Sequence, residues 1–157
     1  MAIEKVREYF TQIGAEEEII VFEASSATVE LAAQALGVEG ARIAKSISLL
    51  KSDGPILVIA AGDAKIDNKK YKEEFGEKAR MIPFDEVEGY IGHAPGGVCP
   101  FAINDGVKVY LDVSLKRFET VFPAAGDAHS AVELKLEKLE KYSKYLKWVD
   151  VCKLPVE

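Results

Sequence analysis

Residues 91–101, IGHAPGGVCPF, constrain the fold of this chain more than any other stretch. They contain three glycines and two prolines. Glycine permits a left-handed backbone and close approach to a ligand, whereas each proline fixes φ and removes an N–H donor. The segment therefore favours neither a helix nor a paired strand, and we predict a stiff loop whose remaining N–H groups can converge on a ligand oxygen. A long turn that only connects two elements is the alternative interpretation.

The sequence around this loop mixes strand and helix patterns. Ile43–Leu50 and the apolar run Pro55–Ala61 read as a hairpin across Asp53-Gly54, and Val107–Val113 reads as a strand after the loop. Helices are expected at 3–13, at 29–36 (capped by Ser25 or Ser26), and at 68–75, 84–91 and 136–146, with short strands at 19–23, 81–82, 120–124 and 131–134. We predict a single α+β domain over residues 1–157, with a mixed, largely antiparallel central sheet and surrounding helices.

Composition and charge exclude several classes of function. Hydrophobic residues make up 48% and charged residues 29%, which is typical of a globular chain, and the net charge is −6. An acidic chain without a Lys/Arg block is not expected to hold a polyanion broadly, so we expect no DNA partner, although narrow recognition of one nucleic-acid end stays possible. No apolar run approaches the roughly 20 residues of a membrane span, and the N-terminus lacks a signal-peptide layout. We therefore expect a cytoplasmic protein without a membrane partner.

Metal and cofactor signatures are weak. There are two cysteines, Cys99 and Cys152, and two histidines, with no zinc-type spacing. The glycines at 92, 96 and 97 precede a strand rather than open a helix, so they do not form a dinucleotide fingerprint. We expect neither a metal nor a cofactor.

Lys45 is the most unusual residue of the predicted strands. Alternation places it with Ile43, Ile47 and Leu49 on one face of the Ile43–Leu50 strand. Burial of an ammonium group is costly unless the group is paired or reaches a polar cavity. A lysine near a strand end can also extend its stem to water. The strand pattern leaves both interpretations open.

Two other side chains invite a catalytic interpretation. Cys99 is a possible nucleophile, but no residue near it in the sequence identifies a base. Asp112, at a predicted strand end, is the kind of carboxylate that more often caps structure than acts as a base. Asp127 in the later loop is similar.

Three motifs in order give the chain a resemblance to the YbaK and prolyl-tRNA synthetase editing-domain family. They are the early-strand lysine in Ile43-Ala44-Lys45-Ser46, the loop from Gly96 to Pro100, and the late glycine-bearing loop that leads from Ala125 to Glu133-Leu134. The opening helices and the Ser25–Thr28 segment are also similar to the family. The resemblance thus covers nearly the whole chain.

The resemblance implies a free-standing trans-editing aminoacyl-tRNA deacylase of the tRNA-Pro type or a related one. Its partners would be the 3′ end of an aminoacyl-tRNA and an aminoacyl-tRNA synthetase. By this resemblance Lys45 contacts the phosphate or ribose of the terminal adenosine, and the backbone of Gly96 and Gly97 lines the aminoacyl pocket as catalytic elements. The expected substrate-binding residues are Ser25, Ser46, Val98, Cys99, Pro100, Asp112 and His129; members of the family differ at the position of His129, so the amino acid is not implied.

Ester hydrolysis is chemically compatible with this set of residues. Negative charge develops on the carbonyl oxygen, and one pre-aimed donor can raise the rate by about 10²–10³. An aminoacyl ester is already activated, so a positioned water suffices and no dedicated protein base is required. Two other classes stay open, namely a non-catalytic module that binds a tRNA end or a protein, and an unrelated hydrolase that uses Cys99.

Overall fold

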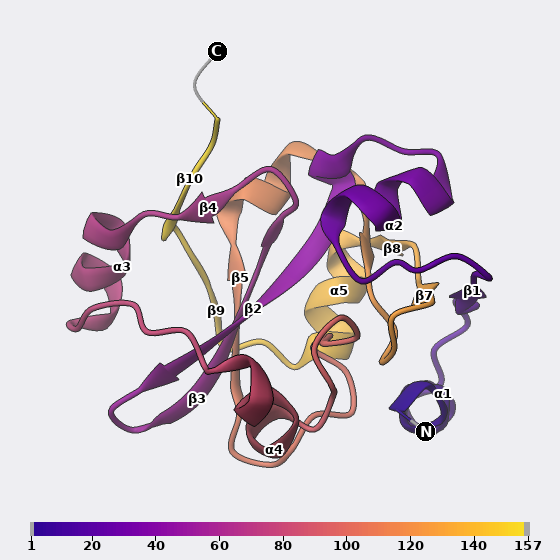
Figure 1. Ribbon diagram of the computed structural model, residues 1–157, viewed down its shortest axis with the longest axis horizontal. Helices are drawn as coiled ribbons and strands as arrows, with labels where there is room; N and C mark the ends of the chain where they lie inside the picture. Colours follow the sequence, from indigo (N-terminus) through magenta and orange to yellow (C-terminus); the bar gives the residue numbers. More distant parts are fainter. Residues whose placement is uncertain (1, 156–157) are drawn as a thin grey trace.

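The computed structural model describes residues 2–155 and is built on a six-stranded sheet (Figure 1). The strand order is β8-β6-β2-β3-β5-β9. The strands are β2 (Ile43–Lys51), β3 (Gly54–Ala61), β5 (Lys108–Asp112), β6 (Thr120–Pro123), β8 (Leu134–Lys135) and β9 (Lys147–Val149). The predicted α+β class and mixed sheet are confirmed.

The β2–β3 hairpin forms the centre of the sheet. Its antiparallel ladder runs from Ala44↔Ala61 to Lys51↔Gly54, and residues 56–61 of β3 are buried. This is the predicted hairpin, since a run that is apolar on both faces is stable only between two covered faces. However, β2 pairs with β6, β3 with β5, and β5 with β9 in parallel. The six-stranded sheet therefore contains more parallel pairing than expected.

The helices end largely where the sequence signals predict. They are α1 (Ala2–Ile13), α2 (Val29–Leu36), α3 (Asn68–Phe75), α4 (Val87–Ile91) and α5 (Leu136–Ser143). In the view of Figure 1, α3 flanks one side of the sheet, and α1, α2 and α5 lie toward the other. The cap of α2 is Thr28, whose hydroxyl accepts from the Leu31 N–H, so the prediction of a Ser25 or Ser26 cap is wrong. Both serines instead lie in the segment that leads to the helix.

Four short strands complete the fold. β1 (Ile20–Val21) pairs with β7 (Ser130–Ala131), and β4 (Lys65–Ile66) pairs with β10 (Cys152–Lys153), both antiparallel. The predicted strand at 131–134 is divided between β7 and β8, and the C-terminal strands were not predicted. Of the described helices, none is both long and apolar enough to cross a bilayer. The β1–β7 pairing is important for the site because it draws residues 22–28 onto the loop before β7.

Candidate functional site: a pocket at the open edge of β2

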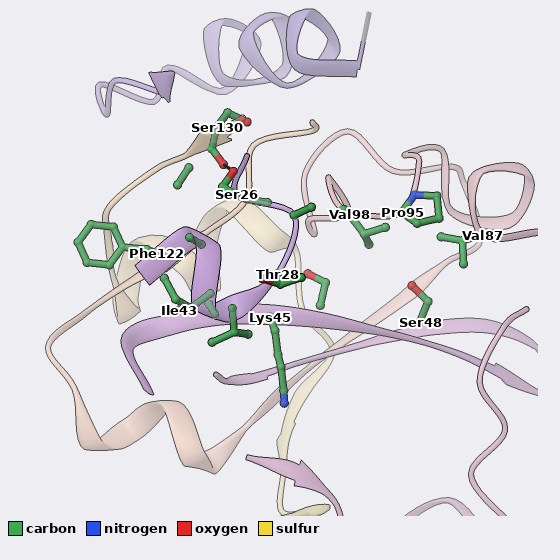
Figure 2. Close-up of a pocket in the computed structure, with 18 of the residues that line it drawn as sticks. Ser26, Thr28, Ile43, Lys45, Ser48, Val87, Pro95, Val98, Phe122 and Ser130 are labelled. Atoms are coloured by element: carbon green, nitrogen blue, oxygen red, sulfur yellow. Dashed lines mark hydrogen bonds between the residues drawn. The ribbon is translucent and has the colours of Figure 1, made fainter. Parts of the chain in front are cut away.

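A pocket of about 400 Å³ lies where the outer edge of β2 loses its partner strand (Figure 2). Pairing with β6 ends at Ala44↔Pro123, and the next contact on that edge is the Ile82 N–H donated to the Ser48 carbonyl at 3.1 Å. The edge between these contacts opens into the pocket. Its residues come from β2, α2, β6, the 81–87 segment, and the segments at 26–28, 95–98 and 124–131: Ser26, Ala27, Thr28, Val29, Ala32, Ile43, Ala44, Lys45, Ser46, Ser48, Met81, Ile82, Phe84, Val87, Pro95, Gly96, Val98, Phe122, Ala124, Ser130 and Ala131.

Three loops that are distant in sequence meet at one wall of this pocket. The Ser26 N–H donates to the Ala128 carbonyl at 2.5 Å, and the Ser26 hydroxyl donates to the Ser130 carbonyl at 3.5 Å. The loop at 94–98 packs against this pair of segments at its two glycines. The wall therefore consists of three loop segments, two joined by hydrogen bonds and the third packed closely against them at its glycines.

The two predicted catalytic glycines have different positions in the wall. Gly96 lines the pocket at φ +92°, a conformation that a side chain would strain. Gly97 does not line the pocket, and its N–H donates to the Ala94 carbonyl at 3.1 Å. A Cβ at residue 97 would lie 2.5 Å from the Cα of Asp127. Gly97 thus permits the close approach of two loops, while Gly96 faces the substrate space.

Two hydroxyls that belong to residues of the pocket lining are buried and have no hydrogen-bond partner among the described residues. They belong to Ser46 on β2 and Ser130 on β7. A buried polar group without a partner costs free energy, and such groups occur where a ligand completes the hydrogen bonds. Ser46 was predicted as a substrate contact. Ser130 was not identified from the sequence, because the family resemblance pointed to the neighbouring His129 instead.

Lys45 contributes to the pocket lining from β2, but its ammonium lies elsewhere. Figure 2 shows the side chain directed to the opposite side of β2 from Ser26, Pro95 and Val98. Burial lowers the pKa of the Lys45 ammonium, while the nearby Cys152 and Asp63 act in the opposite direction. Within the described part of the chain, no carboxylate oxygen forms an ion pair with it. Lys45 is therefore a partly desolvated cation without an ion-pair partner among the described residues.

Cys99 lies outside the pocket and forms a buried pair with His93. Both side chains are fully buried, with the Cys99 Sγ 3.6 Å from the His93 Nε2 and the His93 Nε2 2.6 Å from the Phe101 carbonyl. Burial raises the pKa of the Cys99 thiol to about 12. A neutral thiol without access to solvent is a poor nucleophile. This geometry argues against the interpretation of Cys99 as the nucleophile of an unrelated hydrolase.

The remaining predicted site residues divide into two groups. Val98 lines the pocket, as does Ser46, whereas Ser25, Cys99, Pro100, Asp112 and His129 do not. The exposed His129 ring has its Nδ1 3.1 Å from the Ala24 carbonyl, so it joins two loops of the wall. Ser25 accepts from the Ala27 N–H, which leaves Ser26 as the serine that faces the pocket.

Asp112 lines a different cavity of the molecule and not the pocket. It is 1% exposed, and its carboxylate accepts from the Ser114 N–H at 2.9 Å and from the Val151 N–H at 3.0 Å. It thereby caps the short helix Val113–Arg117 and fixes the C-terminal segment. The interpretation of this carboxylate as a structural cap is confirmed. Nowhere in residues 2–155 do three or more His, Cys, Asp or Glu side chains form a group able to hold a metal ion.

Comparison with known proteins places this geometry among editing domains. The aminoacyl-tRNA editing domain family matches residues 23–142. The uncharacterized protein YwhH of Bacillus subtilis is 53% identical over 154 residues, 98% of both chains. The proline–tRNA ligase of Limosilactobacillus fermentum is 30% identical over 135 residues, which are 80% of this chain and 24% of that protein.

A solved structure agrees with the sequence comparisons. A protein with the proposed role of a trans-editing enzyme for prolyl tRNA synthetase superposes with a TM-score of 0.88 at 25% identity, and 97% of each chain is covered. The matched region, residues 23–142, contains all three loops of the pocket wall and the whole of β2. The chain therefore belongs to the aminoacyl-tRNA editing domain family.

Proposed function

We propose that this protein is a free-standing trans-editing deacylase that hydrolyses the ester bond of mischarged aminoacyl-tRNA. Family membership supports an editing role, and we assign the reaction to the pocket at the open edge of β2. The observation on which the proposal chiefly rests is the pair of buried, unpartnered hydroxyls of Ser46 and Ser130, two residues that line a largely apolar cavity. Pockets of a few hundred Å³ with a few convergent polar groups are typical small-ligand sites.

The electrostatics of the lining suit an ester at the end of a polyanion. The protein carries a net charge of −6, yet the described residues that line the pocket include no carboxylate. The pocket lining itself thus adds no negative charge at the place where a phosphodiester chain would end. Like-charge repulsion at the pocket, which would oppose such a ligand, is avoided.

The proposed reaction is attack of a water oxygen on the ester carbonyl carbon. The carbonyl–ribose oxygen bond breaks, the ribose oxygen takes a proton, and the free amino acid and the tRNA are the products. The Gly96 N–H, which donates to no group of the described residues, is the backbone donor that we assign to the developing oxyanion. The Ser46 and Ser130 hydroxyls would orient the aminoacyl group.

Lys45 keeps the role that the family resemblance implies, as a contact to the terminal phosphate or ribose. Its ammonium group is desolvated and has no ion pair within the described residues, a state that is unfavourable without a ligand. To reach the pocket, the flexible stem would swing around the open edge of β2. This movement is part of the proposal.

The proposed tRNA is tRNA-Pro carrying an amino acid other than proline. The support is the similarity to three proline–tRNA ligases and to the solved trans-editing protein. The chain spans about a quarter or less of the length of these ligases, and it aligns with only that part. A cytoplasmic location and an interaction with a synthetase are further parts of this proposal.

The test is a deacylation screen with purified protein. tRNA-Pro and two unrelated tRNAs are each charged with a panel of labelled amino acids, and release of the amino acid is followed against a buffer control. We expect at least one mischarged tRNA-Pro to be hydrolysed and correctly charged tRNAs to be spared. Saturable tRNA binding without any ester cleavage would instead identify a non-catalytic module of the same fold.

A further inference from the structure

Phe84 is the most exposed large hydrophobic side chain among the described residues. It is 79% exposed, and Met81, three residues earlier, is 59% exposed. Both side chains line the pocket. Apolar area in water is unfavourable, and a large aromatic ring beside a pocket is typical of a binding surface.

The segment that presents Phe84 is anchored on both sides. The preceding Ile82 is buried and donates its N–H to the Ser48 carbonyl, while the following Glu86 N–H donates to the Pro83 carbonyl at 2.8 Å. Val87, which begins α4, is also buried. The backbone that carries the ring is therefore held in place. Binding of a ligand to the ring then requires little ordering of this backbone and costs little conformational entropy.

The chemistry of the proposed substrate requires a partner for a nucleobase at this position. In an aminoacyl-tRNA the ester and the terminal base are attached to the same ribose. When the ester occupies the pocket, the base must lie within one sugar of the pocket rim. The only Lys or Arg among the lining residues that the structure describes is Lys45, whose ammonium lies across β2. Because the proposed function assigns Lys45 to the phosphate or ribose, no cation of the described lining is left to contact the base, and the aromatic face of Phe84 is available.

We propose that Phe84, on the same rim as Met81, is a stacking platform for the terminal base of the tRNA. This inference rests on the proposed deacylase function. Single-stranded ends are held on aromatic rings by stacking, which tolerates any base because each base has a π-face. Phe84 is thus a binding residue for the nucleotide and acts separately from the hydroxyls that face the aminoacyl group.

The first test compares deacylation by Phe84→Ala and Phe84→Tyr with wild type. Loss of a base stack should raise KM by about 5- to 150-fold in the alanine variant, and the tyrosine variant should stay close to wild type. Because stacking involves no ion pair, the ratio of KM values should be the same at about 50 and 200 mM salt. Tyr90→Ala is the matched control, since Tyr90 is a partly exposed aromatic of α4 that does not line the pocket. A KM for Phe84→Ala within twofold of wild type would overturn the proposal while leaving the deacylase function intact.

The second test does not depend on hydrolysis. Phe84→Trp adds an indole at the rim, and the single native tryptophan, Trp148, lies on β9 at the far edge of the sheet. Titration with adenosine 5′-monophosphate should quench the added fluorescence saturably, with no such change in wild type or with ribose 5-phosphate. Absence of quenching overturns the stacking platform even if no tRNA is hydrolysed. Light scattering provides the last check: a wild-type dimer that Phe84→Ala converts to monomers would instead assign this surface to self-association.

Discussion

The unpartnered hydroxyls of Ser46 and Ser130 are the residues on which the proposed chemistry depends most. A structural serine and a ligand-binding serine differ in one respect that can be measured. Removal of the first leaves a buried partner unsatisfied, whereas removal of the second removes an uncompensated polar group from the folded protein. Substitution of a structural serine should therefore lower stability and leave activity per folded molecule unchanged. Substitution of a ligand-binding serine should lower activity and leave stability unchanged or slightly raised.

We expect Ser46→Ala and Ser130→Ala each to lower kcat/KM by about tenfold, which corresponds to the loss of one ordinary hydrogen bond. The free energy of unfolding should be unchanged or slightly raised. Ser114→Ala is the control, because the Ser114 hydroxyl accepts from the buried Ala61 N–H at 3.1 Å, and its loss should cost about 1–2 kcal/mol of stability. Denaturant unfolding and deacylation kinetics on the same samples measure both quantities. Destabilised serine variants with full activity per folded molecule would show that these hydroxyls are structural.

The ammonium of Lys45 gives a second prediction at this scale. Lys45→Met keeps most of the apolar stem and removes the charge. Because burial lowers the pKa of Lys45, removal of the charge should leave stability unchanged or improve it. If the side chain swings to the tRNA, kcat/KM should fall at least tenfold and the salt dependence of KM should weaken. Kinetics at two salt concentrations, with circular dichroism as the check of folding, provide the measurement. Wild-type kinetics in the folded variant would remove Lys45 from the site.

At the scale of elements, the contact between the 94–98 loop and the 125–130 loop sets the shape of the pocket wall. This contact exists because residue 97 has no side chain. Since Gly97 does not line the pocket, its substitution acts on the site through the position of the loops. We therefore expect substitution of Gly97 to affect both stability and activity, and not activity alone.

Gly97→Ala should lower both stability and activity. A Cβ 2.5 Å from the Asp127 Cα forces the two loops apart, and overpacking of this kind costs about 1–3 kcal/mol. Gly89→Ala on α4 is the matched control, because no atom lies within 4 Å of the added carbon and alanine favours the helix. Thermal unfolding and deacylation rates check the pair. An unchanged melting temperature in Gly97→Ala would contradict the proposed loop contact.

The same loop contains a titratable support. The His93 ring joins the two ends of the loop through its contact with the Phe101 carbonyl, and its Nδ1 is buried without a partner among the described residues. Burial lowers the pKa of His93 in the folded protein. The unfolded chain, with a histidine pKa of about 6.5, binds more protons between the two pKa values. Stability should therefore be full above about pH 6.5 and fall as the pH drops through the folded pKa.

We expect His93→Gln, which does not titrate, to flatten this dependence between about pH 7.5 and 5.5. Unfolding free energies across that range measure it, and His129→Asn, at the exposed second histidine, is the control. A wild-type slope that persists in His93→Gln would assign the effect to other groups.

The elements also show what could be predicted from the sequence. The hairpin β2–β3 and the helix α3 were predicted because their signals are local. β9 and β10 were missed because strands of two or three residues exist only through partners distant in sequence. Alternation along β2 placed Ser46 and Ser48 on one face, but their orientation toward a pocket depends on loops that the sequence pattern does not position.

For the whole molecule, the charge distribution determines the type of substrate that can be held. An acidic protein with a pocket lining free of carboxylates, in the part that the structure describes, can bind one neutral or cationic end of a polyanion but not its length. The aminoacyl end of a tRNA has this character, since the amino acid carries an ammonium and the ester is neutral. The pocket at the open edge of β2 is therefore the proposed site of ester hydrolysis.

Whether hydrolysis occurs in this pocket is tested by comparing deacylation of a mischarged tRNA-Pro by wild type and by Ser48→Leu. Figure 2 shows Ser48 directed to the side of β2 on which Pro95 and Val98 lie, so a leucine fills the cavity. We expect wild-type protein to shorten the half-life of the ester and the folded leucine variant to lose at least nine-tenths of this activity (about 1.4 kcal/mol or more in the barrier). Equal hydrolysis by both proteins would contradict the assignment of the reaction to the pocket, because the reaction would then occur elsewhere.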